Sequence, residues 1–253
     1  MLDALRLSFG TFTGVKVEAP TKVNAHLMKM SLLLSFLPAL MVSGTAWAAG
    51  YLAFRFTSAS LVAAVVVVGA EILLTAGLHI DGLLDTADGA AAFAKNGRER
   101  ALEIMKTGNS GPTAFATGSV VLLLQIAALS TAIAKDISVS WIICSVLARL
   151  AVVTSCRTGA KRARPDGLGN PFIGSVDFLW LIPSVVINFA IVAALGIGQR
   201  SALIVTACLV ALAFAEILKR SAEKKFGGLT GDVLGSILEK VRTASLLVLI
   251  VSF

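Results

Sequence analysis

The chain has 253 residues, of which 57% are hydrophobic and 15% charged, and its formal net charge is +7. Soluble domains average about 45–50% apolar and about 25% charged residues, so this composition indicates an integral membrane protein. The basic residues stand in stretches between apolar runs, which is typical of topology signals and argues against a nucleic-acid-binding protein. The three cysteines have no paired spacing and are expected to be buried and reduced.

The chain reads as a single membrane-embedded domain over residues 1–253. Residues 1–30 are mixed in polarity and lack the long apolar core of a signal peptide, so they predict a cytosolic or interfacial segment. Seven apolar runs follow, each close to the length that crosses about 30 Å of hydrocarbon. We therefore expect an all-α, polytopic membrane helix bundle with about six or seven transmembrane helices. The runs are 31–54, 58–80, 113–134, 138–156, 177–197, 201–218 and 233–253, the last of which is interrupted by charges.

Basic residues alternate between the connections. The N-terminal segment and the loops 81–112, 157–176 and 219–232 hold four each. The short connections hold one each: Arg55, Lys135 and Arg200. Because positively charged loops stay on the cytoplasmic side, we expect a multi-pass protein of the cell inner membrane with its functional site facing the cytoplasm.

The stretch "HIDGLLDTADG" sets Asp81, Asp85 and Asp88 at the end of an apolar run. At 100° per residue the three lie within about 60° on one helix face. Stacked carboxylates at a membrane edge favour a hard divalent cation such as Mg²⁺ held with substrate phosphates. Gly82 and Gly89 leave room for a backbone or ligand to approach. The alternative is a solvated acidic helix end near the positive pole of the helix dipole.

A second segment, "GGLTGDVLGSILEKV", repeats this geometry with Asp232, Ser236 and Glu239 after glycines that include Gly231. Two facing acidic helices could hold two metals, or clamp one metal with a diphosphate. The alternative for Asp232 is a helix-capping role.

A third stretch, "RPDGLGNPFIGSVD", is rich in glycine and turn residues. The backbone N–H groups around Gly169, Asn170 and Gly174 could cradle phosphates. The preceding basic run, which ends at Arg164, adds charge that pairs with phosphate. The alternative is an ordinary positively charged cytoplasmic loop.

Three charged residues, Glu71, Arg149 and Glu216, lie inside apolar runs. Ionisable groups there normally face the bundle interior and pair, so we expect Arg149 to pair with Glu71 or Glu216. A direct role of Arg149 in a substrate cavity is the alternative.

Four motifs, "HIDGLLDTADG", "RERALEIMKTGNSGP", "GLGNPFIG" and "GGLTGDVLG", together resemble those of the cobalamin synthase family, the adenosylcobinamide-GDP ribazoletransferases, in the family's order. The resemblance implies a membrane transferase that joins adenosylcobinamide-GDP to α-ribazole or its 5′-phosphate and releases GMP, with Mg²⁺ as cofactor. The first motif is also distantly similar to that of CDP-alcohol phosphotransferases, so an enzyme acting on a nucleotide-activated lipid is the alternative. A transporter is a third alternative, suggested by the charges inside the apolar runs.

For such a reaction we expect Asp81 and Asp85 to bind the metal, and Asp88 to act as a base or as a third ligand. Asp85 and Lys106 are also candidate catalytic residues. Asp232 and Glu239 would hold a second metal or orient the acceptor. The residues expected to bind substrate are His79, Gly82, Gly89, Arg164, Gly169, Asn170, Gly174 and Gly231. The expected partners are the two substrates and the lipid bilayer, without nucleic acid. A homo-oligomer and association with other corrinoid-pathway enzymes are left open.

Overall fold

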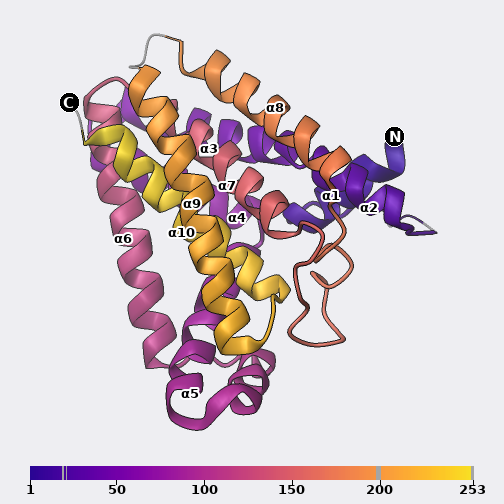
Figure 1. Cartoon of the computed structure of the whole chain (residues 1–253). Helices are drawn as coiled ribbons and strands as arrows, with labels where there is room; N and C mark the ends of the chain where they lie inside the picture. The colour runs from indigo at the N-terminus through magenta and orange to yellow at the C-terminus, as the bar shows by residue number, and fades with distance from the viewer. Residues whose placement is uncertain (19, 21, 198–200, 252–253) are drawn as a thin grey trace.

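The structure, a computed structural model, describes residues 1–18, 20, 22–197 and 201–251, so Arg200 lies outside the described residues. Within them the chain forms ten helices and only isolated β-bridges (Figure 1). The helices are α1 (Leu2–Phe12), α2 (Ala25–Leu33), α3 (Phe36–Thr57), α4 (Ser60–Leu74), α5 (Leu78–Thr107), α6 (Pro112–Ala134), α7 (Ser140–Ser155), α8 (Phe178–Leu195), α9 (Ser201–Phe226) and α10 (Gly231–Ile250).

Four helical segments of the described chain are long and apolar enough to cross a membrane: α2 together with α3, then α6, α8 and α9. A fifth counts if α4 and α5, which are bent by 89° relative to each other, form one broken span. The expected all-α membrane bundle is thus confirmed, with four or five full-length spans. Two of the runs predicted to be spans do not form full-length apolar helices. The run 138–156 forms α7, which has only 16 residues, and the run 233–253 forms α10, which carries four charged side chains.

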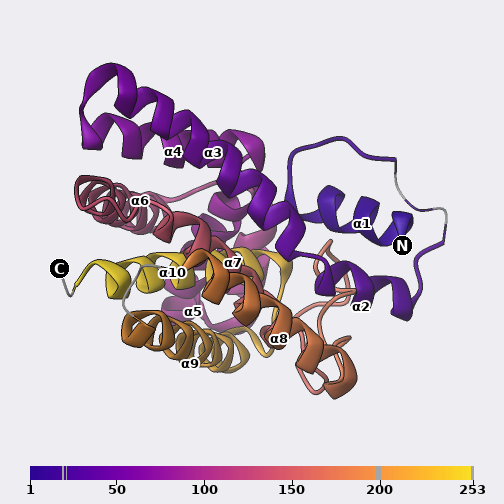
Figure 2. The ribbon, with the colours of Figure 1, turned by 90° about the horizontal axis from the view of Figure 1, so that it is seen from above.

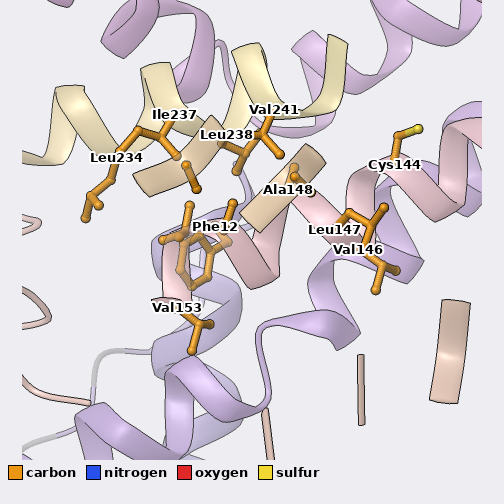
Figure 3. Close-up of a cluster of buried hydrophobic side chains, with 14 of the residues drawn as sticks. Phe12, Cys144, Val146, Leu147, Ala148, Val153, Leu234, Ile237, Leu238 and Val241 are labelled. Atoms are coloured by element: carbon orange, nitrogen blue, oxygen red, sulfur yellow. The ribbon is translucent and has the colours of Figure 1, made fainter. Parts of the chain in front are cut away.

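Helix α7 is the centre of the bundle. Nearly all of its residues are buried, and it packs against α3, α8, α9 and α10 (Figure 2). A helix that is apolar on every side is stable only when neighbours surround it. Figure 3 shows its side chains, including Ala148, meeting Leu238 of α10 and Phe12 of α1 in one apolar cluster.

Left-handed residues set the direction of α5. Ala76 (φ 50°) and Gly77 (φ 72°) turn the chain between α4 and α5. Gly97 (φ 80°, ψ −172°) then breaks α5 itself, so that its second half folds back. A Cβ on Gly89 would lie 2.6 Å from Cγ of Met105, which shows how closely the two halves of α5 pack.

The connections fall into two groups. The short α3–α4 and α6–α7 connections lie towards the same end of the bundle as the C-terminal end of α10 (Figures 1 and 2). The second half of α5 and the α7–α8 loop (residues 156–177) lie towards the other end. This loop is anchored by parallel bridges from Arg157 to Val176 and from Arg162 to Leu229. Two of the four stretches that hold four basic residues each therefore lie towards this second end.

The expected pairing of Arg149 with Glu71 or Glu216 is wrong. Glu71 pairs with Arg242 at 2.5 Å, and Glu216 pairs with two arginines at the more polar end of α9. Nη2 of Arg149 lies 3.0 Å from Nε2 of His79. An apolar run identifies a buried charge, but the packing of helices decides which partner it meets.

Candidate active site

The acidic stripe of α5 meets the first turn of α10 where the two helices cross. A Cβ on Gly82 would lie 2.7 Å from the carbonyl oxygen of Asp232. On the facing helix, a Cβ on Gly235 would lie 3.3 Å from the carbonyl oxygen of His79. Small residues at a helix crossing let the two backbones approach closely. The close approach expected at Gly82 is therefore made by the backbone of α10, which brings Asp232 to the stripe.

The carboxylates at this crossing raise one another's pKa values. Asp85 is buried, and the pKa of its carboxyl is raised to about 6, first by burial and then by the neighbouring aspartates of α5 and α10. Burial also raises the pKa of Asp232, while the guanidinium of Arg164 opposes this effect. A cluster whose carboxyls resist ionisation favours added positive charge.

The α7–α8 loop supplies positive charge to the cluster. Nη2 of Arg164 lies 3.1 Å from Oδ2 of Asp232, and its Nη1 is buried without a hydrogen-bond partner among the described residues. Lys106, near the end of α5, pairs with Asp166 of the loop at 2.8 Å. Oδ1 of Asp166 also lies 3.9 Å from Nε of Arg164, so Lys106 is linked to the cluster only through Asp166 and Arg164. The sequence analysis did not identify Asp166 as a partner of these residues, although it lies inside the quoted glycine-rich motif.

The glycine-rich motif is explained largely by packing. A Cβ on Gly169 would lie 2.6 Å from Cα of Gly231, so the loop backbone rests directly on the start of α10. Gly174 has φ 78°, a left-handed conformation that favours glycine. Nδ2 of Asn170 donates to the carbonyl oxygen of Arg164 at 2.7 Å and so holds the loop beside the carboxylates.

Asp88 has a structural role that the sequence did not suggest. Its Oδ2 accepts a hydrogen bond from the backbone N–H of Gly111, and its Oδ1 accepts one from Ala114 at 2.9 Å. These N–H groups belong to the first turn of α6, which has no capping side chain of its own. Asp88 therefore caps α6 from a different helix.

Glu239 and His79 lie in a buried polar layer beneath the cluster. Glu239 accepts from Gln125 at 2.9 Å and lies 3.3 Å from Arg242. The same layer contains Trp141, whose indole N–H donates to Glu71 at 2.6 Å. Glu239 is two turns, or about 10 Å, along α10 from Asp232. The sequence analysis did not predict a role for Gln125 or Trp141. Their polar side chains stand inside apolar runs, and this was the feature that could have identified them.

Among the described residues, no group of three or more histidine, cysteine, aspartate or glutamate side chains lies close enough together to hold a metal ion. The donors present are nevertheless hard carboxylate oxygens on two crossing helices, beside a loop with an unpartnered guanidinium nitrogen. Mg²⁺ is commonly bound through one or two carboxylates together with substrate phosphates and water. The donor chemistry fits that type of site.

Comparison with known proteins places this sequence in a family. The family model described as cobalamin-5-phosphate synthase matches residues 4–250. An adenosylcobinamide-GDP ribazoletransferase of Nocardioides sp. is 34% identical over 248 residues, which is 98% of each chain. One of the same name from Frankia casuarinae is 38% identical over 198 residues, or 75% of this chain and 71% of that protein. No solved structure matches. The chain belongs to the cobalamin-5-phosphate synthase family.

Proposed function

We propose that this protein is an adenosylcobinamide-GDP ribazoletransferase, which joins adenosylcobinamide-GDP to α-ribazole or its 5′-phosphate and releases GMP. The family match over almost the whole chain supports this assignment. The observation that carries it is the contact of Arg164 with Asp232 at the crossing of α5 and α10. Charges of both signs at one crossing suit a diphosphate bound together with a cation.

The reaction exchanges one phosphorus–oxygen bond for another. A ribazole hydroxyl oxygen attacks the phosphorus nearer the cobinamide, and the bond from this phosphorus to the oxygen shared with the GMP phosphate breaks. GMP keeps the bonding electrons, and the hydroxyl proton passes to a base. Such a reaction requires mainly positioning and neutralisation of charge on the phosphates.

Asp81 and Asp85, with Asp232 facing them, would hold Mg²⁺, which when bound neutralises charge on the diphosphate. Arg164 and Lys106 would stabilise the phosphate of the departing GMP. Asp88 would accept the hydroxyl proton, because each of its oxygens keeps a lone pair beyond the one used for α6. Its two backbone hydrogen bonds would fix the direction of the carboxylate.

We further propose that the protein is a multi-pass protein of the cell inner membrane and that the carboxylate cluster faces the cytoplasm. Support comes from the basic residues, which gather in the N-terminal segment, in α5, in the α7–α8 loop and at the end of α9. Positively charged stretches of this kind remain on the cytoplasmic side.

The test measures GMP release and corrinoid product from purified membranes given adenosylcobinamide-GDP and α-ribazole, with and without Mg²⁺. We expect Mg²⁺-dependent turnover that is lost in Asp81→Asn. Asp136→Asn is the matched control, because Asp136 is exposed in the α6–α7 connection and has a left-handed conformation that asparagine tolerates.

The possible results separate the proposals. Turnover that survives in Asp81→Asn would support the proposed function but show that Asp81 is not an essential metal ligand. Turnover that needs no divalent cation would remove Mg²⁺ as cofactor. Wild-type membranes that release no GMP, but transfer from a CDP-linked lipid, would replace the ribazoletransferase with a CDP-alcohol-type phosphotransferase.

A further inference from the structure

A cavity lies outside the carboxylate cluster, between α5, α6, α9 and α10. Its volume is about 410 Å³. Apolar side chains, among them Leu218, Phe226 and Ile237, form much of its wall. Lys225 and Lys240 also line it, from α9 and α10. A cavity with apolar walls and two ammonium groups fits an amphipathic anion.

The cavity is on a different face of α5 from the acidic stripe. Ala87 and Ala90 line the cavity, and at 100° per residue they lie about 200° and 140° around the helix from Asp85. Helix α5 therefore stands between most of the cavity and its own aspartates. On α10 and α6 the cavity lies nearer the cluster, since Ser236 is one turn from Asp232 and Thr113 precedes Ala114, which donates to Asp88.

The two lysines of the cavity have no anionic partner. No ion pair or hydrogen bond joins Lys225 or Lys240 to another of the described side chains, whereas the nearby Lys219 pairs with Glu223 at 3.1 Å. The pKa of Lys240 is lowered, first by burial and then by the charge of Lys225. Two like charges that share a partly buried cavity would be stabilised by an anion between them.

The neighbours of the cavity place it beside lipid. Helices α6 and α9, which flank it, are both long and apolar enough to span a membrane. Each packs against α5 and α10, but in the described part of the chain they make no extensive contact with each other (Figure 1). Lys225 lies in the last turn of α9, where a spanning helix reaches the depth of the lipid headgroups.

From these observations we propose that this cavity binds an anionic phospholipid from the cytoplasmic leaflet. The headgroup phosphate lies between Lys225 and Lys240, and the glycerol and upper acyl chain lie against the apolar wall. Basic pockets between membrane helices on this side recognise anionic headgroups through the same combination of charge and burial.

The experiment measures equilibrium binding of radiolabelled phosphatidylglycerol to the purified full-length protein in neutral detergent, with phosphatidylcholine as the uncharged comparison. We expect Lys225→Gln/Lys240→Gln to weaken phosphatidylglycerol binding about tenfold or more. Lys225→Arg/Lys240→Arg, which keeps both charges, should retain binding and show that the fold tolerates change at these positions. Lys224→Gln removes an exposed charge next to the cavity and should bind like wild type.

Equal binding by the double glutamine variant and wild type, or no preference over phosphatidylcholine, would overturn the proposal. The alternative occupant of the cavity is a water-soluble phosphate compound, which would pair with the same two lysines. Displacement of the lipid by α-ribazole 5′-phosphate, with a raised KM for that acceptor only in the double glutamine variant, would make the cavity a substrate subsite instead. Because the primary readout is binding, its failure is distinct from failure of the ribazoletransferase assignment.

Discussion

At the scale of single residues, Asp88 links the acidic stripe of α5 to the first turn of α6. Asp88→Ala would leave two backbone N–H groups without their acceptor, and we expect the free energy of unfolding to fall by about 1–2 kcal/mol. Asp88→Asn keeps one acceptor oxygen and should lose less. If Asp88 is also the base, both variants lose turnover alike. Thermal unfolding and GMP release check this, and near-normal turnover by Asp88→Asn would leave Asp88 with capping alone.

Asp85 should destabilise the metal-free protein, since its pKa is raised to about 6 in the folded state from an ordinary value near 3.8. Well below pH 3.8 the carboxyl is protonated in both states and has no effect. Its destabilising effect grows between about pH 4 and 6 and is complete above that range. After allowance for solvent screening, we expect Asp85→Asn to gain about 1–2 kcal/mol at pH 7.5.

The measurement is thermal unfolding of both proteins with a chelator at pH 7.5 and at pH 4. A gain in Tm of a few degrees at the higher pH that is mostly lost at the lower pH is the expected result. An equal gain at both values would assign the effect to packing rather than to charge.

At the scale of elements, the crossing of α5 and α10 positions the cluster. In Gly82→Ala the added Cβ would meet the backbone of Asp232 rather than a side chain that can move away. We expect a loss of about 1–3 kcal/mol in stability, together with most of the turnover, because the two helices must separate. Gly69→Ala, in α4 with no atom within 4 Å of the new Cβ, is the matched control. It should be neutral or slightly stabilising, and similar behaviour of the two variants would contradict the close crossing.

Helix periodicity predicted some element-scale features and not others. The stripe of Asp81, Asp85 and Asp88 follows from 100° per residue and needs no tertiary information. The apolar runs at 138–156 and 233–253 were expected to be spans, yet α7 is a short central helix and α10 a charged one. Hydropathy measures how apolar a segment is, and it cannot distinguish burial by lipid from burial by other helices.

At the scale of the whole molecule, the end that carries the cluster should face the cytoplasm. Lys95, in α5, and Lys135, in the α6–α7 connection, are both exposed and lie in loops expected on opposite sides. We expect a membrane-impermeant maleimide to label Lys135→Cys in cells whose outer membrane is permeabilised, and Lys95→Cys only after lysis. The native cysteines give little background because all three are free and buried. Labelling of Lys95→Cys before lysis would reverse the proposed orientation.

The sequence by itself determined the membrane class, the all-α fold, the acidic stripe and the family resemblance, because composition, periodicity and motif order are local properties of the chain. Only the tertiary structure decided that Asp232 joins this stripe, that Asp88 caps α6 and that Arg242, rather than Arg149, pairs with Glu71. These contacts join residues far apart in the chain. They depend on where glycines let two helices cross and on how each helix is rotated, and neither is fixed until the whole bundle packs.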